Sequence, residues 1–338
     1  MESIVVCPWH FWPLSPCKGK SPYRCSDPGI FFLGASLSDI REKRPDHILC
    51  YDIHHPQVYI VSTSDIARSP LSGHAATLLS QLSAQGKTIF AGHEAQALTS
   101  LSPRHLDKLL QRLVRQKWLV RLSKGLYLIL PLEAGVESRY TEHEFLIASR
   151  LITPSAIAYW SALNYHGLTE QIPRTVFVAT PRRRFHAQQT ILGITYRFIT
   201  VAPARFFGLK QVWLDGHPVQ ITDPEKTLVD ALDQPHRCGG LSEVAEAFWL
   251  ASQHADFSWD LFTRYAERMS NRAIFKRAGY LGEQLNLPLT AFYPRWQANL
   301  SQGYVRLDPG LPTGGHYNAR WRVRVNIDSN DLLEWQQH

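Results

Sequence analysis

Residues 102–115 narrow the choice of fold more than any other segment of this chain. Ser102-Pro103 is a helix start signal, because serine favours the N-cap and proline the first helical position. Apolar residues then recur at i, i+3, i+4, i+7 and i+8, at Leu106, Leu109, Leu110, Leu113 and Val114. The pattern predicts an amphipathic helix that buries one continuous stripe.

The opposite face of this predicted helix is basic. It carries Arg104, His105, Lys108, Gln111, Arg112 and Arg115. A polar helix face is often only solvated, but such a face usually mixes the two signs of charge. The near absence of acids on this one favours an anionic partner.

The flanking segments complete a small module. Helical spacing and a glycine at the C-cap predict a first helix over residues 74–85, and a short second helix follows over 92–99 after extended residues 88–90. Downstream, residues 118–122 and 126–130 read as two strands joined by Ser123-Lys124-Gly125. Three helices followed by a hairpin are the arrangement of a winged helix-turn-helix domain, which we expect over residues 69–133.

Charge is concentrated in this module. Between residues 71 and 131, eight Lys and Arg stand against two Asp and Glu, a net charge of +6, while the whole chain carries +7. Cations that neutralise phosphates release counterions, and a helix fits the major groove of DNA. We therefore expect binding to double-stranded DNA, with Arg104, His105 and Lys108 near base edges. Arg104 is the candidate for reading a guanine.

The remaining basic positions of the module suit the DNA backbone. Arg112 and Arg115 lie further along the helix, where they would meet phosphates, and Lys124 at the tip of the hairpin would reach the adjacent backbone or minor groove. Winged helices also serve as protein-interaction modules, so this alternative stays open at the level of sequence.

Residues 1–68 form a poorly patterned extension. Their first 65 residues hold seven of the 21 prolines and four of the five cysteines. The spacing of Cys7, His10, Cys17, Cys25 and Cys50 does not match a paired zinc knuckle, so we expect no metal site. A short strand is expected near residues 57–61. Translation from a non-ATG codon, such as that of Val61, is the alternative for this region.

Localisation is predicted from what the sequence does not contain. The five cysteines are an odd number and thinly spread, which suggests a reducing compartment. The start has no cationic segment typical of a signal peptide, and no stretch approaches 18 uncharged apolar residues. We expect a cytoplasmic protein without a membrane partner.

Residues 136–338 predict a larger α+β domain. Two helices, over residues 141–151 with a Thr141/Glu144 capping box and over 155–165, precede strands at 175–180, 191–201, 211–214 and 219–221. Thr222 is the expected N-cap of the next helix, and two or three more helices are expected near residues 241–253, 261–268 and 272–285. Strands followed by helices favour α+β over a doubly wound sheet.

Three stretches of the chain resemble AbiEi-type antitoxins of type IV, abortive-infection toxin-antitoxin systems. They are Arg121-Leu122-Ser123-Lys124-Gly125-Leu126-Tyr127-Leu128-Ile129-Leu130-Pro131, Ala162-Leu163-Asn164-Tyr165-His166-Gly167-Leu168-Thr169-Glu170-Gln171-Ile172-Pro173 running into 176–180, and Ile221-Thr222-Asp223-Pro224-Glu225-Lys226-Thr227-Leu228-Val229-Asp230-Ala231-Leu232. The likeness covers about residues 70–300. It implies a regulator that represses its own operon through its winged helix, and counters a nucleotidyltransferase-like toxin through its C-terminal domain, with or without direct contact.

Two other functions are open at this stage. A stand-alone transcription factor with a ligand-sensing second domain would use the same DNA-binding module. A DNA-guided nuclease would need an acid and lysine cluster, which Asp223, Glu225 and Lys226 superficially offer. These residues stand at a helix start, where acids offset the dipole, so we interpret Asp223 and Glu225 as caps and expect no catalytic residue and no cofactor.

Two further basic features could form a secondary surface. Arg182, Arg183 and Arg184 follow Pro181 in an expected loop, where they would meet phosphate, an acidic toxin surface or only water. Arg320, Arg322 and Arg324 alternate with Trp321, Val323 and Val325, which predicts a strand with one basic and one apolar face. An outer strand with a charged, aggregation-resistant face is the simpler interpretation of this second pattern.

Overall fold

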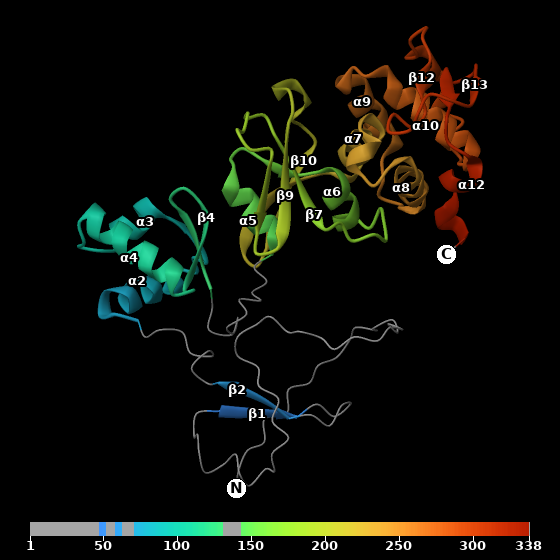
Figure 1. Cartoon of the computed structure of the whole chain (residues 1–338). Coiled ribbons are helices and arrows are strands. Elements are labelled where there is room, and N and C mark those ends of the chain that lie inside the picture. The colour runs from blue at the N-terminus through green and yellow to red at the C-terminus, as the bar shows by residue number, and fades with distance from the viewer. Residues whose placement is uncertain (1–46, 52–57, 63–70, 131–142, 338) are drawn as a thin grey trace. The chain divides into compact units, whose positions relative to one another are not determined.

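The computed structural model of the chain describes residues 47–51, 58–62, 71–130 and 143–337 (Figure 1). Backbone contacts divide the chain into two compact units, of which the first contains residues 96–120 and the second residues 141–338. The cysteines and the histidine weighed as zinc ligands in the N-terminal extension lie outside the described residues, apart from the backbone of Cys50. Within the N-terminal extension, β1 (His47–Tyr51) pairs antiparallel with β2 (Val58–Ser62), and β2 confirms the strand expected near 57–61.

Residues 71–130 contain the expected helices and strands in the expected order. The helices are α2 (Gly73–Ala84), α3 (Gly92–Ala97) and α4 (Pro103–Arg115), and the strands are β3 (Ile89–Ala91), β4 (Leu119–Ser123) and β5 (Leu126–Ile129). The strands form a sheet in the order β3-β5-β4. Gly86 follows α2 with a φ of 66°, as a glycine at this end of a helix should.

Helix α4 follows its sequence pattern closely. Ser102 is its N-cap and Pro103 its first residue. Four leucines of the stripe, Leu106, Leu109, Leu110 and Leu113, are buried, and Val114 is half-buried. Burying a leucine side chain contributes roughly 1.5–3 kcal/mol, so the stripe fixes which face of α4 remains in water.

A mixed six-stranded sheet organises the first part of residues 143–337. Its strands are β6 (Ala156–Ile157), β7 (Thr175–Thr180), β8 (Gln188–Ile191), β9 (Ile194–Thr200), β10 (Leu209–Leu214) and β11 (His217–Thr222). They lie in the order β10-β11-β6-β7-β9-β8. The β11–β6 and β7–β9 pairs are parallel and the other three are antiparallel. The expected α+β class is therefore confirmed.

Both faces of this sheet are covered. Phe177 and Ala179 of β7 belong to the helical core, which includes α6 (Tyr159–Tyr165). Val176 and Val178 are also buried and point the other way, because side chains alternate along a strand. Helix α5 (Glu144–Leu151) contacts β6, β7 and β11 and covers that second face (Figure 1).

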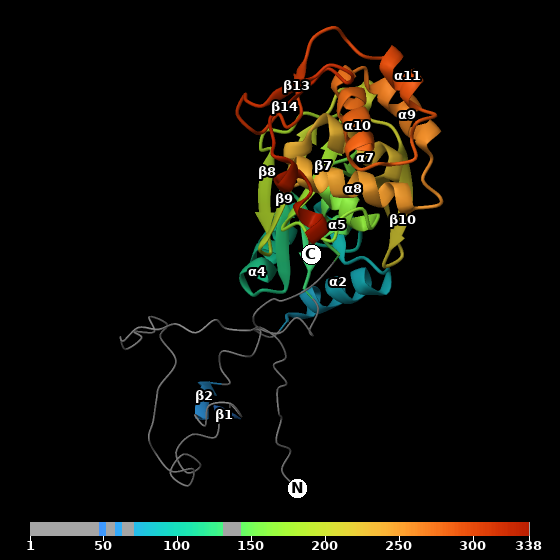
Figure 2. The same ribbon diagram turned by 90° about the vertical axis from the view of Figure 1, so that its right-hand side faces the viewer.

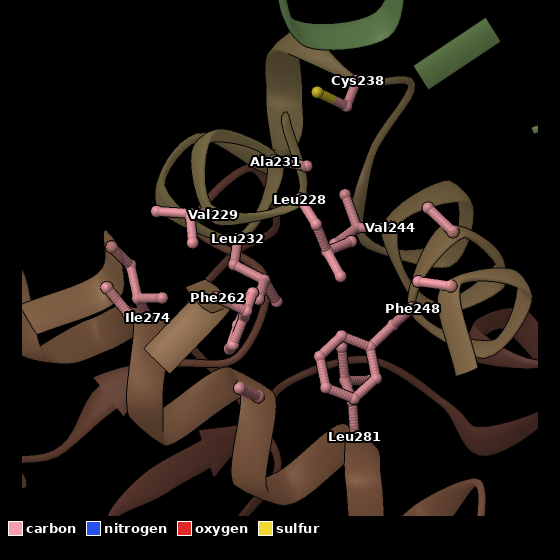
Figure 3. Close-up of a cluster of buried hydrophobic side chains, with 14 of the residues drawn as sticks. Leu228, Val229, Ala231, Leu232, Cys238, Val244, Phe248, Phe262, Ile274 and Leu281 are labelled. Carbon is pink, nitrogen blue, oxygen red and sulfur yellow. The ribbon is translucent and has the colours of Figure 1, made fainter. Parts of the chain in front are cut away.

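The helices after the sheet enclose the main core. They are α7 (Pro224–Asp233), α8 (Leu241–Gln253), α9 (Trp259–Met269), α10 (Arg272–Gln284) and α11 (Tyr293–Ala298). A short 3-10 turn, η4 (Pro235–Arg237), follows α7, and another, η3 (Pro203–Arg205), lies between β9 and β10. Figure 3 shows Leu228 and Leu232 of α7 meeting Phe248 of α8 and Phe262 of α9. The three helices expected over 241–253, 261–268 and 272–285 are confirmed as α8, α9 and α10.

The structure corrects two of the expected elements around the sheet. Residues 155–165 are not one helix, because Ala156 and Ile157 pair with β7 and β11 and only then does α6 begin. Residues 191–201 are not one strand, because the chain reverses at Leu192-Gly193, with φ values of 49° and 80°, and pairs β8 with β9. Positive φ at both positions is the requirement of the tightest hairpin turn.

Two expected caps are also corrected. Thr141 lies outside the described residues, and α5 is capped by His143, whose Nδ1 accepts the Phe145 backbone N–H. Thr222 belongs to β11, and the cap of α7 is Asp223, whose carboxylate accepts the Lys226 backbone N–H at 2.7 Å.

The C-terminal segment adds a small sheet in the order β12-β14-β13 and a short helix. Its strands are β12 (Val305–Arg306), β13 (His316–Asn318) and β14 (Val323–Val325), followed by α12 (Ser329–Leu332) and the 3-10 turn η5 (Glu334–Gln337). Figure 2 shows β14 beside α10. Within the described ranges, no helix is both long enough and apolar enough to cross a bilayer.

Candidate nucleic-acid interface

The basic residues of α4 lie on its solvent side. Arg104, His105, Lys108, Gln111, Arg112 and Arg115 are all exposed. The leucine stripe buries the other side of the helix, so these six side chains lie on the side that remains in water, where Asp107 is the exposed acid. Lys124 is also exposed, in the two-residue turn between β4 and β5.

The contacts of this face leave its charge largely uncompensated. His105 Nδ1 lies 2.7 Å from Ser102 Oγ, and Arg112 Nη2 donates to Ser72 Oγ at 3.0 Å. Across the described part of the chain, none of the Lys and Arg residues of this face forms an ion pair with a carboxylate. Both partners found are neutral hydroxyls, so the guanidinium and ammonium charges remain available to an anion.

Lys87 differs from the other cations of the module. Its Nζ donates to Glu94 Oε1 at 2.6 Å, and Glu94 Oε2 accepts the Ala91 backbone N–H at 2.7 Å. These two hydrogen bonds to the carboxylate, the backbone one first, lower the pKa of Glu94. Through Glu94, Lys87 therefore supports the start of α3, and the exposed basic face described here consists of residues of α4.

A separate polar centre joins two of the motif stretches in residues 143–337. His166, at the end of α6, donates from Nε2 to the Thr222 carbonyl oxygen at 2.7 Å. The Thr222 hydroxyl in turn lies 2.7 Å from the Thr227 hydroxyl in α7. Burial lowers the pKa of His166, although the Thr222 carbonyl partly opposes this. The neutral imidazole thus fastens the stretch around 162–173 to the stretch around 221–232.

The acids considered for nuclease chemistry have structural partners. Asp223 caps α7 and also accepts the Tyr265 hydroxyl at 3.0 Å. Glu225 accepts the Ser258 backbone N–H at 2.8 Å, so it supports the start of α9 rather than that of its own helix. The capping interpretation is confirmed for Asp223, while the cap formed by Glu225 belongs to another helix. Over the described residues, no group of His, Cys, Asp and Glu could hold a metal ion.

Lys226 completes this cluster in a way that sequence reasoning missed. It is 3% exposed and forms an ion pair with Asp230, which is 4% exposed, one helical turn further along α7. Burial raises the pKa of Asp230 to about 6, and the Lys226 ammonium partly opposes this. The available signal was the i,i+4 spacing of the two charges within a segment that is otherwise apolar.

The arginines expected to form a secondary basic surface do not share one environment: some are exposed, and others have partners within the protein. Arg182 and Arg183 are exposed, but Arg184 is half-buried, with its guanidinium 3.8 Å from the centre of the Phe198 ring and Nη2 donating to Gln189. Arg320 pairs with Glu283 at 2.8 Å, and Arg324 donates to the Gly314 carbonyl at 2.9 Å.

Residues 320–325 are not one continuous strand. Arg322 has a φ of 53°, and β14 begins only at Val323. Trp321, Val323 and Val325 are nevertheless all buried, as the alternation indicated. Apolar packing explains this segment, and a nucleic-acid or toxin contact by its arginines remains a prediction.

Comparison with known proteins places the helical core and sheet in a family. Residues 156–284 match the family model described as the AbiEi antitoxin C-terminal domain. The chain contains an AbiEi antitoxin domain. This confirms the resemblance found in the sequence for the stretches at 162–180 and 221–232, while the stretch at 121–131 lies outside the match. The matched range begins with the first residue of β6 and ends with the last residue of α10.

Solved structures extend the likeness of fold beyond the AbiEi antitoxin domain. The crystal structure of the RV2827C protein from Mycobacterium tuberculosis aligns with a TM-score of 0.57 and 16% identity, over 81% of this chain and 98% of that one. At this identity the likeness concerns the fold alone. A search of curated proteins finds no match.

The family match gives the polar centre its place in the AbiEi antitoxin domain. His166, Thr222, Thr227 and the Lys226–Asp230 pair all lie inside the matched residues. The exposed cationic residues of α4 lie outside them. The antitoxin assignment and the nucleic-acid prediction therefore depend on different parts of the chain and can be tested separately.

Proposed function

We propose that this protein is a DNA-binding transcriptional regulator and the antitoxin of a type IV toxin-antitoxin system. Residues 69–133 act as a winged helix-turn-helix domain that binds the promoter of its own operon and represses it. Residues 136–338 counter a cognate nucleotidyltransferase-like toxin. The AbiEi antitoxin domain supports the antitoxin role.

One observation carries the DNA-binding part of the proposal. Helix α4 turns a leucine stripe inward and leaves Arg104, Lys108, Arg112 and Arg115 in water, with no carboxylate partner among the residues that the structure describes. If the N-terminal end of α4 enters a major groove, Arg104 and Lys108 are the first cations to reach the bases. Lys124 in the β4–β5 turn suits a phosphate or the minor groove.

A nuclease is the weaker candidate. Asp223, Glu225 and Lys226 hold a cap, the start of α9 and a buried ion pair, and Glu225 and Lys226 are buried. Carboxylates committed to the protein's own backbone are poorly placed to act on a phosphodiester. The function that we propose for this protein is therefore not enzymatic.

A mobility-shift assay with the protein's own promoter at moderate salt tests the DNA-binding role. Arg104→Ala combined with Lys108→Ala should abolish the shift, because it removes both leading cations. Lys210→Ala is the control, since it removes one exposed cation from β10. An unchanged shift with the double variant would refute the assignment.

The antitoxin role has its own test with the full-length chain. Co-expression with the product of a neighbouring gene that encodes a nucleotidyltransferase-like protein should restore growth. The Arg104→Ala/Lys108→Ala protein should restore growth equally well when both genes are expressed from unrelated promoters. Loss of rescue in that variant, at equal protein level, would contradict a separate C-terminal antitoxin function.

A further inference from the structure

A cavity beside α8 gathers acidic and aromatic side chains that the proposed function does not use. Its volume is about 680 Å³. The walls come from the segment after α6, from α8 and from the C-terminal η5, all within the second compact unit. Four glutamates line it, at positions 170, 243, 246 and 334, and none of the described residues that line it is a Lys, Arg or His.

Glu246 is the buried member of this group. It is 9% exposed, and it has no hydrogen-bond or ion-pair partner among the residues that the structure describes. Burial, together with the carboxylates of Glu243 and Glu170, raises the pKa of Glu246 to about 6. A desolvated carboxylate without a partner costs free energy at neutral pH, and a bound cation would offset that cost.

Two tryptophans supply an aromatic wall. The ring centres of Trp249 and Trp335 are 5.5 Å apart, with the planes inclined by 45°. Trp335 Nε1 is buried and has no acceptor within the described part of the chain. The faces of indole rings attract cations, most strongly where water is excluded.

The arrangement suits an organic cation better than a metal ion. No three carboxylates, imidazoles or thiols in the described ranges lie close enough to share a metal. A guanidinium is large and planar, donates in pairs to carboxylates and stacks on aromatic rings. A cavity of several hundred Å³ also has room for more than one side chain.

We propose that this cavity binds arginine side chains of a peptide segment of a partner protein. Glu246 would accept the guanidinium that enters deepest, and the Trp249 and Trp335 rings would pack on it. Glu170 and Glu334, which are exposed, would attract the segment at the rim. The proposal does not depend on the DNA-binding role.

Isothermal titration of the full-length protein at low salt tests this. The probe is a blocked Arg-Ala-Arg tripeptide, and its matched control is the same peptide with citrulline, which keeps the shape and loses the charge. The arginine peptide should bind and the citrulline peptide should not. A blocked Lys-Ala-Lys peptide should bind several-fold more weakly, because an ammonium cannot form the paired hydrogen bonds.

Substitutions locate the binding. Glu246→Gln should weaken the arginine peptide about tenfold, as expected for loss of a buried charged hydrogen bond. Glu170→Gln with Glu334→Gln changes only exposed side chains, so it should fold normally and still weaken binding several-fold. Asp256→Asn, an exposed acid outside the cavity, should leave binding unchanged. Equal binding of the arginine and citrulline peptides, equal binding of the lysine peptide, or no effect of either glutamine variant would overturn the proposal.

Discussion

The indole ring of Trp321 lies directly against the backbone of Gly279 in the middle of α10. A Cβ atom at position 279 would overlap three atoms of that ring. Trp321 is fully buried and also meets Tyr293 edge-on, with ring centres 5.2 Å apart. The absence of a side chain at residue 279 therefore permits the C-terminal segment to close over the helical core.

Gly279→Ala should destabilise the protein by about 3 kcal/mol, because the fully buried ring has little room to move. The direction of this change in the free energy of unfolding is informative, since Gly→Ala inside an unobstructed helix usually stabilises a protein by about 1 kcal/mol. Gly73→Ala, at a position with no atom within 4 Å of the added carbon, is the control and should be neutral or slightly stabilising. Urea unfolding measures both, and a stabilised Gly279→Ala protein would show that Trp321 does not pack as described.

The buried Lys226–Asp230 pair predicts a second stability effect. Lys226→Met should cost about 3–5 kcal/mol, because it leaves Asp230 buried without a counter-charge. Adding Asp230→Asn should recover a large part of that loss, since the unpaired charge disappears. Urea unfolding of the two single variants and the double variant gives the coupling free energy. Additive losses would mean that the two side chains do not interact.

His166 predicts a pH effect. Its pKa is lowered in the folded protein, so below about 6.5 the unfolded chain takes up a proton that the folded chain resists. Stability from this group is present above pH 6.5 and is lost as the pH falls. The His166→Gln protein should therefore lose less stability than the wild type between pH 7.5 and 5.5.

Asp230 has a raised pKa, so this group makes the folded protein more stable as the pH falls over part of the same range. Comparing the His166→Gln protein with the wild type removes this opposing effect. Asp230 is present in both proteins, so its contribution cancels in the difference. Unfolding free energies at several pH values provide the measurement. Identical pH profiles would show that His166 does not hold the neutral state in the folded protein.

Sequence patterns predicted the elements whose signals are local. Ser102-Pro103 and a leucine stripe predict helix α4, and an uninterrupted run of helix-forming residues predicts α8. Strand β6 could not be predicted in this way. Ala156 and Ile157 are in a strand only because β7 and β11 flank them, which is a long-range contact. The β8–β9 turn also lacks the usual signal, since leucine rarely adopts the positive φ of Leu192.

The candidate sites also differ in whether a local sequence signal or a long-range contact defines them. An exposed basic face could be predicted because one helix carries it at regular spacing. The Lys226–Asp230 pair and the acidic cavity could not, because burial decides what those charges do. Glu243 and Glu246 look like ordinary solvent-facing acids of α8 until the C-terminal segment places Trp335 beside them.

Individual cations of the basic face should make distinguishable contributions. Arg104→Ala should relax the preference for a guanine and cost about 1–3 kcal/mol on the specific site alone, if Arg104 reads a base edge. Arg115→Ala should weaken specific and non-specific DNA alike, because a phosphate contact carries no sequence information. Competition binding with scrambled duplex measures both, and equal losses on both duplexes for Arg104→Ala would assign it to the backbone instead.

The salt dependence of promoter binding tests the central claim most directly. Fluorescence anisotropy of a labelled promoter duplex between 50 and 200 mM salt should give a log–log slope of about −4, as expected for four or five neutralised phosphates. Arg115→Ala and Lys124→Ala should each reduce that slope by about one. A wild-type slope near zero, or one unchanged in both variants, would contradict DNA binding through the basic face of α4.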